Sequence, residues 1–385
     1  MKIGIVCYPT YGGSGVIATE LGLALAKHGH NVHFITYQKP PRLNVFNENI
    51  YFHEVTVSDY PLFQYKPYDS VLAGKLVDII EYEKLDLLHV HYAIPHASVA
   101  YLVKQICKER GKIIPVITTL HGTDITLVGK DASLTPVVEF SINHSDGVTT
   151  VSESLKHDTH ANFKINKDIK VIYNFIDFEK FKKIDKDHFK KAIAPNNERL
   201  ILHTSNFRKV KRVEDVIRVF EQLVKEVPSK LILIGDGPER SRLEVLCREL
   251  GLCNEIRFLG KQDAIEELLA VADLFLMPSE TESFGLAALE AMACQVPVIC
   301  TDSGGLPELV EHGVSGFLTD VGDIRRMVEY AKHILSSNEI LARFSKEAFR
   351  RAQQFDINKI LLEYEAYYQE VVEKTLKAEL NNVNN

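Results

Sequence analysis

Short apolar runs and amphipathic stretches alternate along the first half of the chain. The apolar runs have the length and composition of β-strands and lie at 2–8, 31–37, 85–91, 115–120 and 147–151. The stretches between them have the pattern of helices and lie near 14–28, 68–84, 96–110, 133–144 and 152–162. Nearly continuous apolar strands separated by helices indicate a parallel sheet that helices cover on both faces.

The same alternation starts again in the second half. Strands are expected at 199–205, 230–236, 255–260, 274–279 and 297–301, and helices near 213–226, 239–250, 264–271 and directly after residue 285. Between the halves, residues 171–193 change from apolar to strongly charged, which places a linker near 172–178. The pattern predicts an α/β protein of two doubly wound Rossmann-like domains facing a central cleft, because ligands of such sheets bind beyond the carboxyl ends of the strands.

The composition is typical of a globular protein in a reducing compartment. The chain has 385 residues, of which 45% are hydrophobic and 25% charged, and its six cysteines never form a CxxC pair. The formal net charge of −7 gives no global positive field that would gather nucleic acid or an anionic membrane. No apolar run approaches the ~20 residues of a membrane span, and the start lacks a signal peptide. We therefore expect a soluble, cytoplasmic protein without a stable membrane anchor, in which an anionic ligand is bound by a local cluster.

A glycine-rich turn follows the first strand. Gly12, Gly13 and Gly15 stand where a helix begins, and backbone N–H groups at such a turn bind anions. The spacing also matches the dinucleotide fingerprint, but the acid that this fingerprint requires at the end of the second strand is absent near Gln38. An anion site without NAD is favoured over a turn that is merely tight.

The second half carries a basic turn in the corresponding place. Arg208, Lys209, Lys211 and Arg212 lie between a strand end and a helix start, where cations oppose the helix dipole. A bound polyanion would explain this arrangement, and a solvated basic loop is the alternative. Gly237, in the GDGPER turn after the next strand, lies at the same predicted edge of the sheet.

Two acids flank the start of a later helix, eight positions apart. Glu282 precedes the turn Ser283-Phe284-Gly285, and Glu290 lies inside an apolar run, where an unbound carboxylate is costly. At a helical rise of ~1.5 Å per residue the separation is roughly 12 Å, about the length of a sugar–diphosphate–ribose chain. Carboxylates bind vicinal hydroxyls, and N–H groups at the helix start would face a diphosphate. The alternatives are a helix N-terminal acid for Glu282 and a salt bridge for Glu290.

These motifs together resemble the family-four retaining glycosyltransferases, which have the two-Rossmann-domain GT-B fold. The likeness covers nearly the whole chain and includes SFG with EAMA, GDGPER, the segment DSGGLPE at 302–308, and Gly313-x-x-Gly316-Phe317. It implies that the last helix returns to the first domain. The expected domains are therefore 1–172 with 357–385 on the acceptor side, and 173–356 on the nucleotide-sugar side.

The resemblance also implies roles for individual residues. Lys211 and the N–H of Gly15 would contact the diphosphate, and His121 would lie beside the donor sugar near the reacting carbon. Asn206 occupies a place where the family usually has arginine, and Arg208 is the expected replacement. The implied catalytic residues are His121, Arg208, Lys211 and Glu282. The implied donor site consists of Gly15, Asn206, Arg208, Lys211, Gly237, Glu282, Ser283, Phe284, Gly285, Leu286 and Glu290.

Within the family, the overall likeness is to a branch that moves N-acetylglucosamine from UDP-N-acetylglucosamine to the hydroxyl of L-malate in the first step of bacillithiol biosynthesis. The segments that carry it are YGGSGVIATELG, HVHYAIPHA, TTLHGTDIT, YNFID and SNFRKVKRVEDVIRVF. Malate would then be held at strand ends of the first domain by Ser14, Tyr92 and Thr119, together with a cation that the sequence does not identify. Each has a plain structural alternative, as a helix N-cap, a packing aromatic and a strand residue respectively.

No metal is expected in the reaction. Asp185-Lys186-Asp187 is the only DxD sequence and lies in the charged run after the linker, so we interpret it as solvated surface. His89 and His91 are spaced as a metal pair on one strand face, but His89 is more simply a core histidine. The family resemblance favours front-face attack, in which the leaving phosphate oxygen accepts the proton of the acceptor.

Other functions remain open at this point. A nucleotide-sugar 2-epimerase shares the architecture, and a sugar-nucleotide sensor would bind without turnover. A dinucleotide oxidoreductase is disfavoured by the missing acid. Within the transferases, inositol phosphate, a lipid or a glycan are alternative acceptors, and the oligomeric state, including a homo-oligomer, is open.

Overall fold

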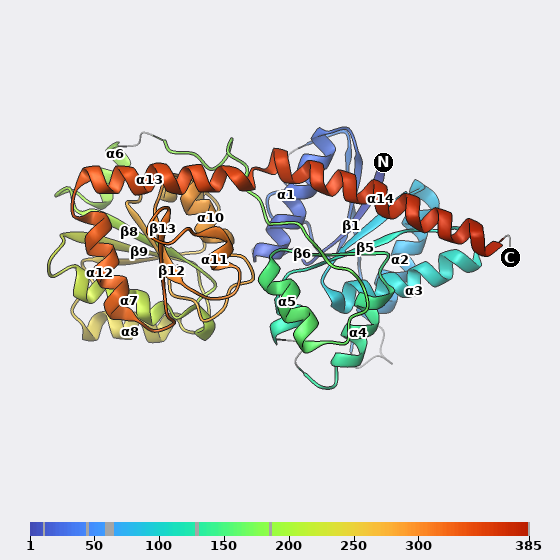
Figure 1. Ribbon diagram of the computed structural model, residues 1–385, viewed down its shortest axis with the longest axis horizontal. Coiled ribbons are helices and arrows are strands. Elements are labelled where there is room, and N and C mark those ends of the chain that lie inside the picture. The colour runs from blue at the N-terminus through green and yellow to red at the C-terminus, as the bar shows by residue number, and fades with distance from the viewer. Residues whose placement is uncertain (11, 44–45, 58–64, 128–130, 185–186, 384–385) are drawn as a thin grey trace. The chain divides into compact units, whose positions relative to one another are not determined.

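The computed structural model describes residues 1–10, 12–43, 46–57, 65–127, 131–184 and 187–383. The chain forms two compact units (Figure 1). The N-terminal unit consists of Met1–Asn174 with Ile357–Asn385, and the C-terminal unit consists of Phe175–Asp356. For comparison, the sequence placed the first boundary at 172/173 and the second at 356/357.

The N-terminal unit is built on a seven-stranded sheet in the order β3-β2-β1-β4-β5-β6-β7, with every neighbouring pair parallel. The strands are β1 (Lys2–Val6), β2 (Asn31–Thr36), β3 (Ile50–Glu54), β4 (Leu87–His91), β5 (Val116–Leu120), β6 (Gly147–Thr150) and β7 (Lys170–Val171). The helices are α1 (Gly13–Lys27), α2 (Tyr68–Glu83), α3 (Ser98–Glu109), α4 (Thr135–His144), α5 (Glu153–Asn162) and α14 (Ile357–Val383). Single π-helical turns, η1 (Ala93–Ala97) and η2 (Thr123–Leu127), follow β4 and β5.

The last helix, red in Figure 1, completes the core of this unit. Tyr364 and Tyr368 of α14 are fully buried, and the hydroxyl of Tyr367 accepts the N–H of Val148 in β6 at 3.0 Å. On another part of the sheet, α2 and α3 pack against β1, β2 and β4 through a common apolar cluster. The two ends of the chain therefore build one unit.

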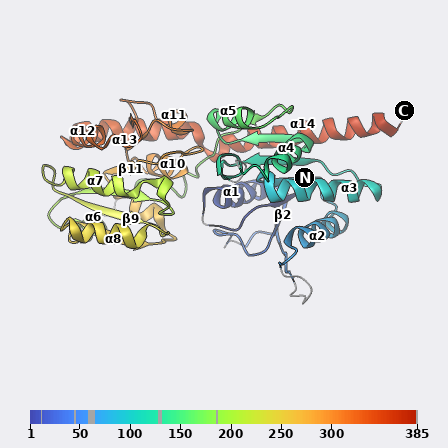
Figure 2. The same ribbon diagram turned by 90° about the horizontal axis from the view of Figure 1, so that it is seen from below.

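The C-terminal unit repeats the design with a six-stranded parallel sheet in the order β10-β9-β8-β11-β12-β13. Its strands are β8 (Arg199–Thr204), β9 (Ser229–Ile234), β10 (Ile256–Gly260), β11 (Leu274–Met277), β12 (Val298–Thr301) and β13 (Gly316–Thr319). Its helices are α6 (Asp187–Ile193), α7 (Val213–Leu223), α8 (Arg240–Glu249), α9 (Ile265–Leu269), α10 (Leu286–Ala293), α11 (Leu306–Leu309), α12 (Ile324–Leu335) and α13 (Asn338–Ala352), with short 3-10 turns η3 (Lys209–Lys211) and η4 (Gln353–Phe355). Figure 2 shows helices on both sides of this sheet.

All ten strands expected from the sequence are present, and three more were not predicted. The additional strands are β3, β7 and β13, which lie at edges of the two sheets. The six cysteines are free thiols. Within the described residues, no helix has both the length and the apolar character needed to cross a membrane.

Candidate active site

Both sheets reverse their strand order at one point, and the predicted site residues lie on or after the strands at this point or next to it. In the N-terminal unit the reversal falls between β1 and β4, and in the C-terminal unit between β8 and β11. Crevices beyond the carboxyl ends of the strands at such points are the usual ligand sites of doubly wound sheets. Each unit therefore has its own candidate ligand site at its point of reversal.

In the C-terminal unit, the basic turn meets the first of the two acids. The ammonium of Lys211, at the end of η3, donates to Glu282 Oε1 at 2.5 Å, and the hydroxyl of Ser279 donates to the same oxygen at 2.8 Å. The Lys211 and Glu282 side chains are only 17% and 12% exposed, so this ion pair is partly shielded from water. Two residues that the sequence assigned to neighbouring parts of one ligand are thus in direct contact.

Arg208 and Asn206 also lie together, on the exposed surface of the loop after β8. In the amide orientation that satisfies both side chains, the Asn206 oxygen accepts hydrogen bonds from Nε and Nη2 of Arg208 at 3.1 and 3.2 Å. The asparagine found at the usual arginine position therefore orients the arginine two residues later. Arg212, by contrast, is bound to Asp215 at 2.6 Å and to Glu280 at 3.4 Å, so its charge is compensated within the unit.

Close backbone approaches explain the glycines of these turns. A Cβ on Gly237 would lie 2.2 Å from the carbonyl oxygen of Asn206, so the GDGPER turn packs directly on the loop after β8. Gly285 is the N-cap of α10 with φ 97°, and a Cβ there would lie 2.5 Å from Leu306. Gly305 donates its N–H to the carbonyl of Glu282 at 2.8 Å, which fixes the loop that carries this acid.

Of the other predicted donor-site residues in this unit, Ser283, Phe284 and Leu286 lie at the start of α10, and Glu290 lies further along the helix. The Phe284 side chain is buried, and its ring centroid lies 5.3 Å from that of Phe355, so this side chain belongs to the core. Glu290 lies within α10 and is 6% exposed. The helix begins at Leu286, so only the second half of the interval from Glu282 to Glu290 is helical. The separation of roughly 12 Å, which assumed a helical rise over all eight positions, therefore does not apply.

In the N-terminal unit, the glycine turn begins α1 as expected. A Cβ on Gly15 would lie 2.4 Å from the carbonyl oxygen of Thr10 and 2.6 Å from that of Tyr8, so only glycine fits between this helix and the loop after β1. The adjacent Ser14 hydroxyl is 2.7 Å from the hydroxyl of Tyr92, the residue directly after β4. Two of the three residues predicted to hold the acceptor are therefore in contact.

His121, directly after β5, lies against Tyr92. Its Nε2 is 2.8 Å from Nδ1 of the buried His91 at the end of β4, and its ring is 5.4 Å from that of Tyr92. Burial lowers the pKa of His121 to about 3. His121 is therefore neutral at physiological pH and presents hydrogen-bonding nitrogens rather than a positive charge.

Asp124 is a site residue that the sequence did not single out. It is 1% exposed, and its carboxylate accepts the N–H groups of Ala93 and Gly122, both at 3.0 Å, and of His121 at 3.3 Å. Burial raises its pKa to about 6, and these N–H groups oppose that rise. Asp124 ties the segment after β4 to the segment after β5, which carries His121. The feature of the sequence that could have indicated Asp124 is its position three residues after His121, a histidine at the end of a strand.

Thr119 belongs to a buried network below the surface of the site. Its hydroxyl lies 2.7 Å from His89 Nε2 and 2.6 Å from the Thr149 hydroxyl, and His89 Nδ1 lies 2.7 Å from the hydroxyl of Tyr368. Both nitrogens of His89 are thus occupied, as expected for a core histidine. Of the DxD sequence, Asp187 begins α6, whereas Asp185 and Lys186 lie outside the described residues.

Comparison with known proteins agrees with this architecture. The family model for glycosyltransferase family 4 matches residues 11–180, and the model for group 1 glycosyl transferases matches residues 184–351. The chain belongs to these GT-B glycosyltransferases and is therefore an enzyme of sugar transfer. The N-acetyl-alpha-D-glucosaminyl L-malate synthase of Bacillus anthracis is 50% identical over 97% of this chain and 97% of its own length. An uncharacterized glycosyltransferase of Methanocaldococcus jannaschii is 32% identical over 82% of this chain and 84% of its own.

Solved structures show the same fold. Anabaena HepE in complex with UDP and glucose has a TM-score of 0.81 at 22% identity, covering 96% of this chain and 99% of that chain. A sucrose-phosphate synthase from Thermosynechococcus elongatus has a TM-score of 0.81 at 19% identity, covering 97% and 100%. The predicted class of two Rossmann-like domains is confirmed.

Proposed function

We propose that this enzyme transfers N-acetylglucosamine from UDP-N-acetylglucosamine to the hydroxyl of L-malate, with retention at the anomeric carbon, as the first step of bacillithiol biosynthesis. The observation that carries the proposal is the 50% identity to the L-malate synthase over 97% of both chains. The contacts at the two switch points are compatible with this chemistry.

The donor is proposed to bind at the C-terminal unit. Glu290 would accept the ribose hydroxyls, and N–H groups of Ser283 to Leu286 at the start of α10 would face the diphosphate. Lys211 would turn from Glu282 to the diphosphate, which frees the Glu282 carboxylate for the hydroxyls of the hexose. Arg208, oriented by Asn206, would supply a second cation, and Gly237 would let the backbone approach the ligand.

The acceptor is proposed to bind at the N-terminal unit. The Ser14 and Tyr92 hydroxyls, 2.7 Å apart, form a donor pair beside His121. Thr119 stays a predicted contact, although its hydroxyl is already bound to His89 and Thr149. Malate is a dianion and the protein carries a net charge of −7, so local donors and a nearby cation must provide the attraction.

The chemistry follows from the charges that develop. The reacting carbon gains oxocarbenium character while the diphosphate leaves with added negative charge. Arg208, Lys211 and the N–H groups of Gly15 and of the α10 start would stabilise that charge without a metal ion. The neutral His121 would contact the donor sugar, and the leaving phosphate oxygen would take the proton from the malate hydroxyl during front-face attack.

Mass spectrometry of the purified protein with UDP-N-acetylglucosamine and a panel of acceptors tests the proposal. We expect a glycosylated malate and UDP in equal amounts, and no product with inositol phosphate or other hydroxy acids at comparable rates. Consumption of the donor without malate would contradict the proposal, and solvent hydrogen at carbon 2 would then identify an epimerase. Binding of the donor without turnover would indicate a sensor.

The remaining expectations concern the setting of the reaction. We propose that the enzyme acts in the cytoplasm, where its free thiols stay reduced and both small-molecule substrates are present. Nucleic acid and a membrane anchor are not part of the proposed function.

A further inference from the structure

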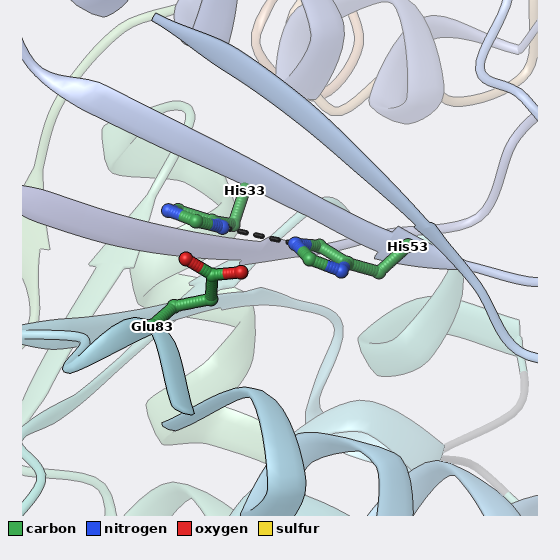
Figure 3. A group of neighbouring side chains, drawn as sticks. All are labelled: His33, His53 and Glu83. Carbon is green, nitrogen blue, oxygen red and sulfur yellow. Dashed lines mark hydrogen bonds between the residues drawn. The ribbon is translucent and has the colours of Figure 1, made fainter. Parts of the chain in front are cut away.

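One group of side chains outside the candidate active site has the composition of a metal site. His33 lies on β2, His53 on the edge strand β3, and Glu83 at the last position of α2 (Figure 3). One ligand atom from each lies within 4.8 Å of the others, and no other group of three or more His, Cys, Asp or Glu meets this criterion in the described part of the chain. The proposed sugar transfer uses none of these residues.

The strand register explains why the three residues meet. In the parallel pair of β2 and β3, Ile35 is opposite His53 and His33 is opposite Tyr51. Side chains at alternate positions of a strand share a face, so His33, Ile35 and His53 lie on the same face of the sheet. Ile35 packs in the apolar cluster that includes α2, and α2 ends at Glu83.

The two rings already lie close to the separation that a shared ion needs. His33 Nδ1 and His53 Nε2 are 2.9 Å apart, joined by the hydrogen bond drawn in Figure 3. Zinc–nitrogen bonds of ~2.0–2.1 Å at tetrahedral angles place two ligand nitrogens roughly 3.3 Å apart, a change of a few tenths of an ångström. The half-buried Glu83 carboxylate needs a larger shift, which its flexible side chain can supply.

Both rings are in the form that binds a metal. Burial lowers the pKa of His33 to about 4, helped by the neighbouring His53 and Lys2, and burial also lowers the pKa of His53. Neutral imidazoles are the ligating species. The proton now shared between Nδ1 of His33 and Nε2 of His53 would move to the outer nitrogen of its own ring, so each imidazole stays neutral and no net proton is released.

We propose that His33, His53 and Glu83 bind one zinc ion, with water as the fourth ligand. Two imidazole nitrogens and a carboxylate oxygen suit tetrahedral zinc, and the ion would fasten the edge strand β3 to β2 and to the end of α2. The cation of Lys2, which donates to the Glu83 backbone oxygen at 2.8 Å, opposes binding. Lys75 opposes it near His53, whereas Asp78 favours it, so a moderate affinity is expected.

Calorimetric titration of the untagged, chelator-treated full chain with zinc sulfate tests this site. We expect one equivalent to bind with a Kd below about 10 µM and to raise the melting temperature. His53→Ala and Glu83→Gln should each weaken binding at least about tenfold. His157→Ala, which removes an exposed histidine on α5, is the matched control and should leave the Kd unchanged.

Three outcomes would overturn the proposal. These are a Kd weaker than about 100 µM, a Kd unchanged in both cluster variants, or zinc that binds without raising the melting temperature. UDP binding by each variant reports that its C-terminal unit is folded. Because Glu83→Gln keeps the size of the side chain, it tests the ligand role even if His53→Ala lowers the stability of the strand.

Discussion

At the scale of single residues, the main finding is that Lys211 and Glu282 form an ion pair with each other. The family resemblance implies a diphosphate contact for the lysine and a hexose contact for the acid, and the structure joins the two side chains at 2.5 Å. In the absence of a ligand, this pair compensates both charges. A ligand with an anionic group for the lysine and hydroxyl groups for the acid could replace it. If the donor binds as proposed, this one ion pair is exchanged for two ligand contacts.

Replacing Lys211 by alanine tests the cation. We expect turnover to fall by ~10²–10³, because one stabiliser of the leaving diphosphate is lost. Lys209→Ala, an exposed neighbour in the same 3-10 turn, is the control and should retain most of the activity. Steady-state rates of UDP release measure both variants, and near-normal turnover of Lys211→Ala would exclude its proposed role.

Substitutions of Glu290 and Glu282 should have different effects, because Glu290 is proposed to bind the ribose and Glu282 the hexose. Glu290→Gln is expected to weaken UDP binding about tenfold, since a neutral amide accepts fewer hydrogen bonds from two hydroxyls. Glu282→Gln should leave UDP affinity nearly unchanged but impair use of the sugar nucleotide. Calorimetry with UDP distinguishes them, and unchanged affinity in Glu290→Gln would show that the ribose assignment is wrong.

The acceptor residues are tested by removing one hydroxyl at a time. Ser14→Ala and Tyr92→Phe should raise the KM for malate several-fold and leave UDP affinity intact, because each removes a hydrogen-bond donor to a carboxylate. Thr119→Val should raise this KM as well, and it should lower the melting temperature because His89 loses a buried partner. Tyr37→Phe, at an exposed tyrosine after β2, is the control. Unchanged malate kinetics in the Ser14, Tyr92 and Thr119 variants would show that the acceptor binds elsewhere.

At the scale of elements, Asp124 connects the segments after β4 and β5, and its ionisation should be visible in the pH profile. Above a pKa of about 6 the carboxylate accepts three backbone N–H groups; below it the protonated acid accepts fewer. Malate-dependent turnover should therefore fall as the pH drops through about 6. His121, with its pKa near 3, stays neutral across that range.

Asp124→Asn provides the comparison. Its amide cannot accept all three N–H groups, so we expect lower turnover at pH 7.5 and no acidic limb near pH 6. UDP affinity, which reports the C-terminal unit, should be unchanged. A limb that persists in Asp124→Asn would assign the titration to another group.

The elements themselves differ in how well the sequence predicts them. Central parallel strands are buried on both faces and form continuous apolar runs, and nine of the ten strands that the sequence indicated are of this kind. The tenth, β10, is an edge strand with only Ile256 fully buried. The edge strand β3 has the sequence IYFHE, and none of its residues is fully buried, so it carries no such signal. The starts of α1 and α10 were predicted to within a few residues because a glycine precedes each helix, Gly12 before α1 and Gly285 before α10.

At the scale of the whole molecule, two similar units place their glycine and cation turns at the same topological position. That much could be predicted, because the alternation of strands and helices fixes which loops share a sheet edge. The pairing of Ser14 with Tyr92, and the burial of the Thr119 hydroxyl, depend on side-chain packing between distant segments and leave no local pattern. The identity of the acceptor could be predicted only from the resemblance to a known family.

A last prediction separates catalysis from stability in the whole enzyme. Initial rates should survive EDTA, because cationic side chains and helix N-termini are proposed to stabilise the leaving diphosphate. If zinc binds at His33, His53 and Glu83, the same treatment should lower the melting temperature, and added zinc should restore it without changing the initial rate at a temperature where the chain stays folded. Loss of the rate with rescue by Mg²⁺ or Mn²⁺ would contradict metal-independent transfer. Loss that follows unfolding, with rescue by zinc alone, would instead assign the ion to the edge of the sheet.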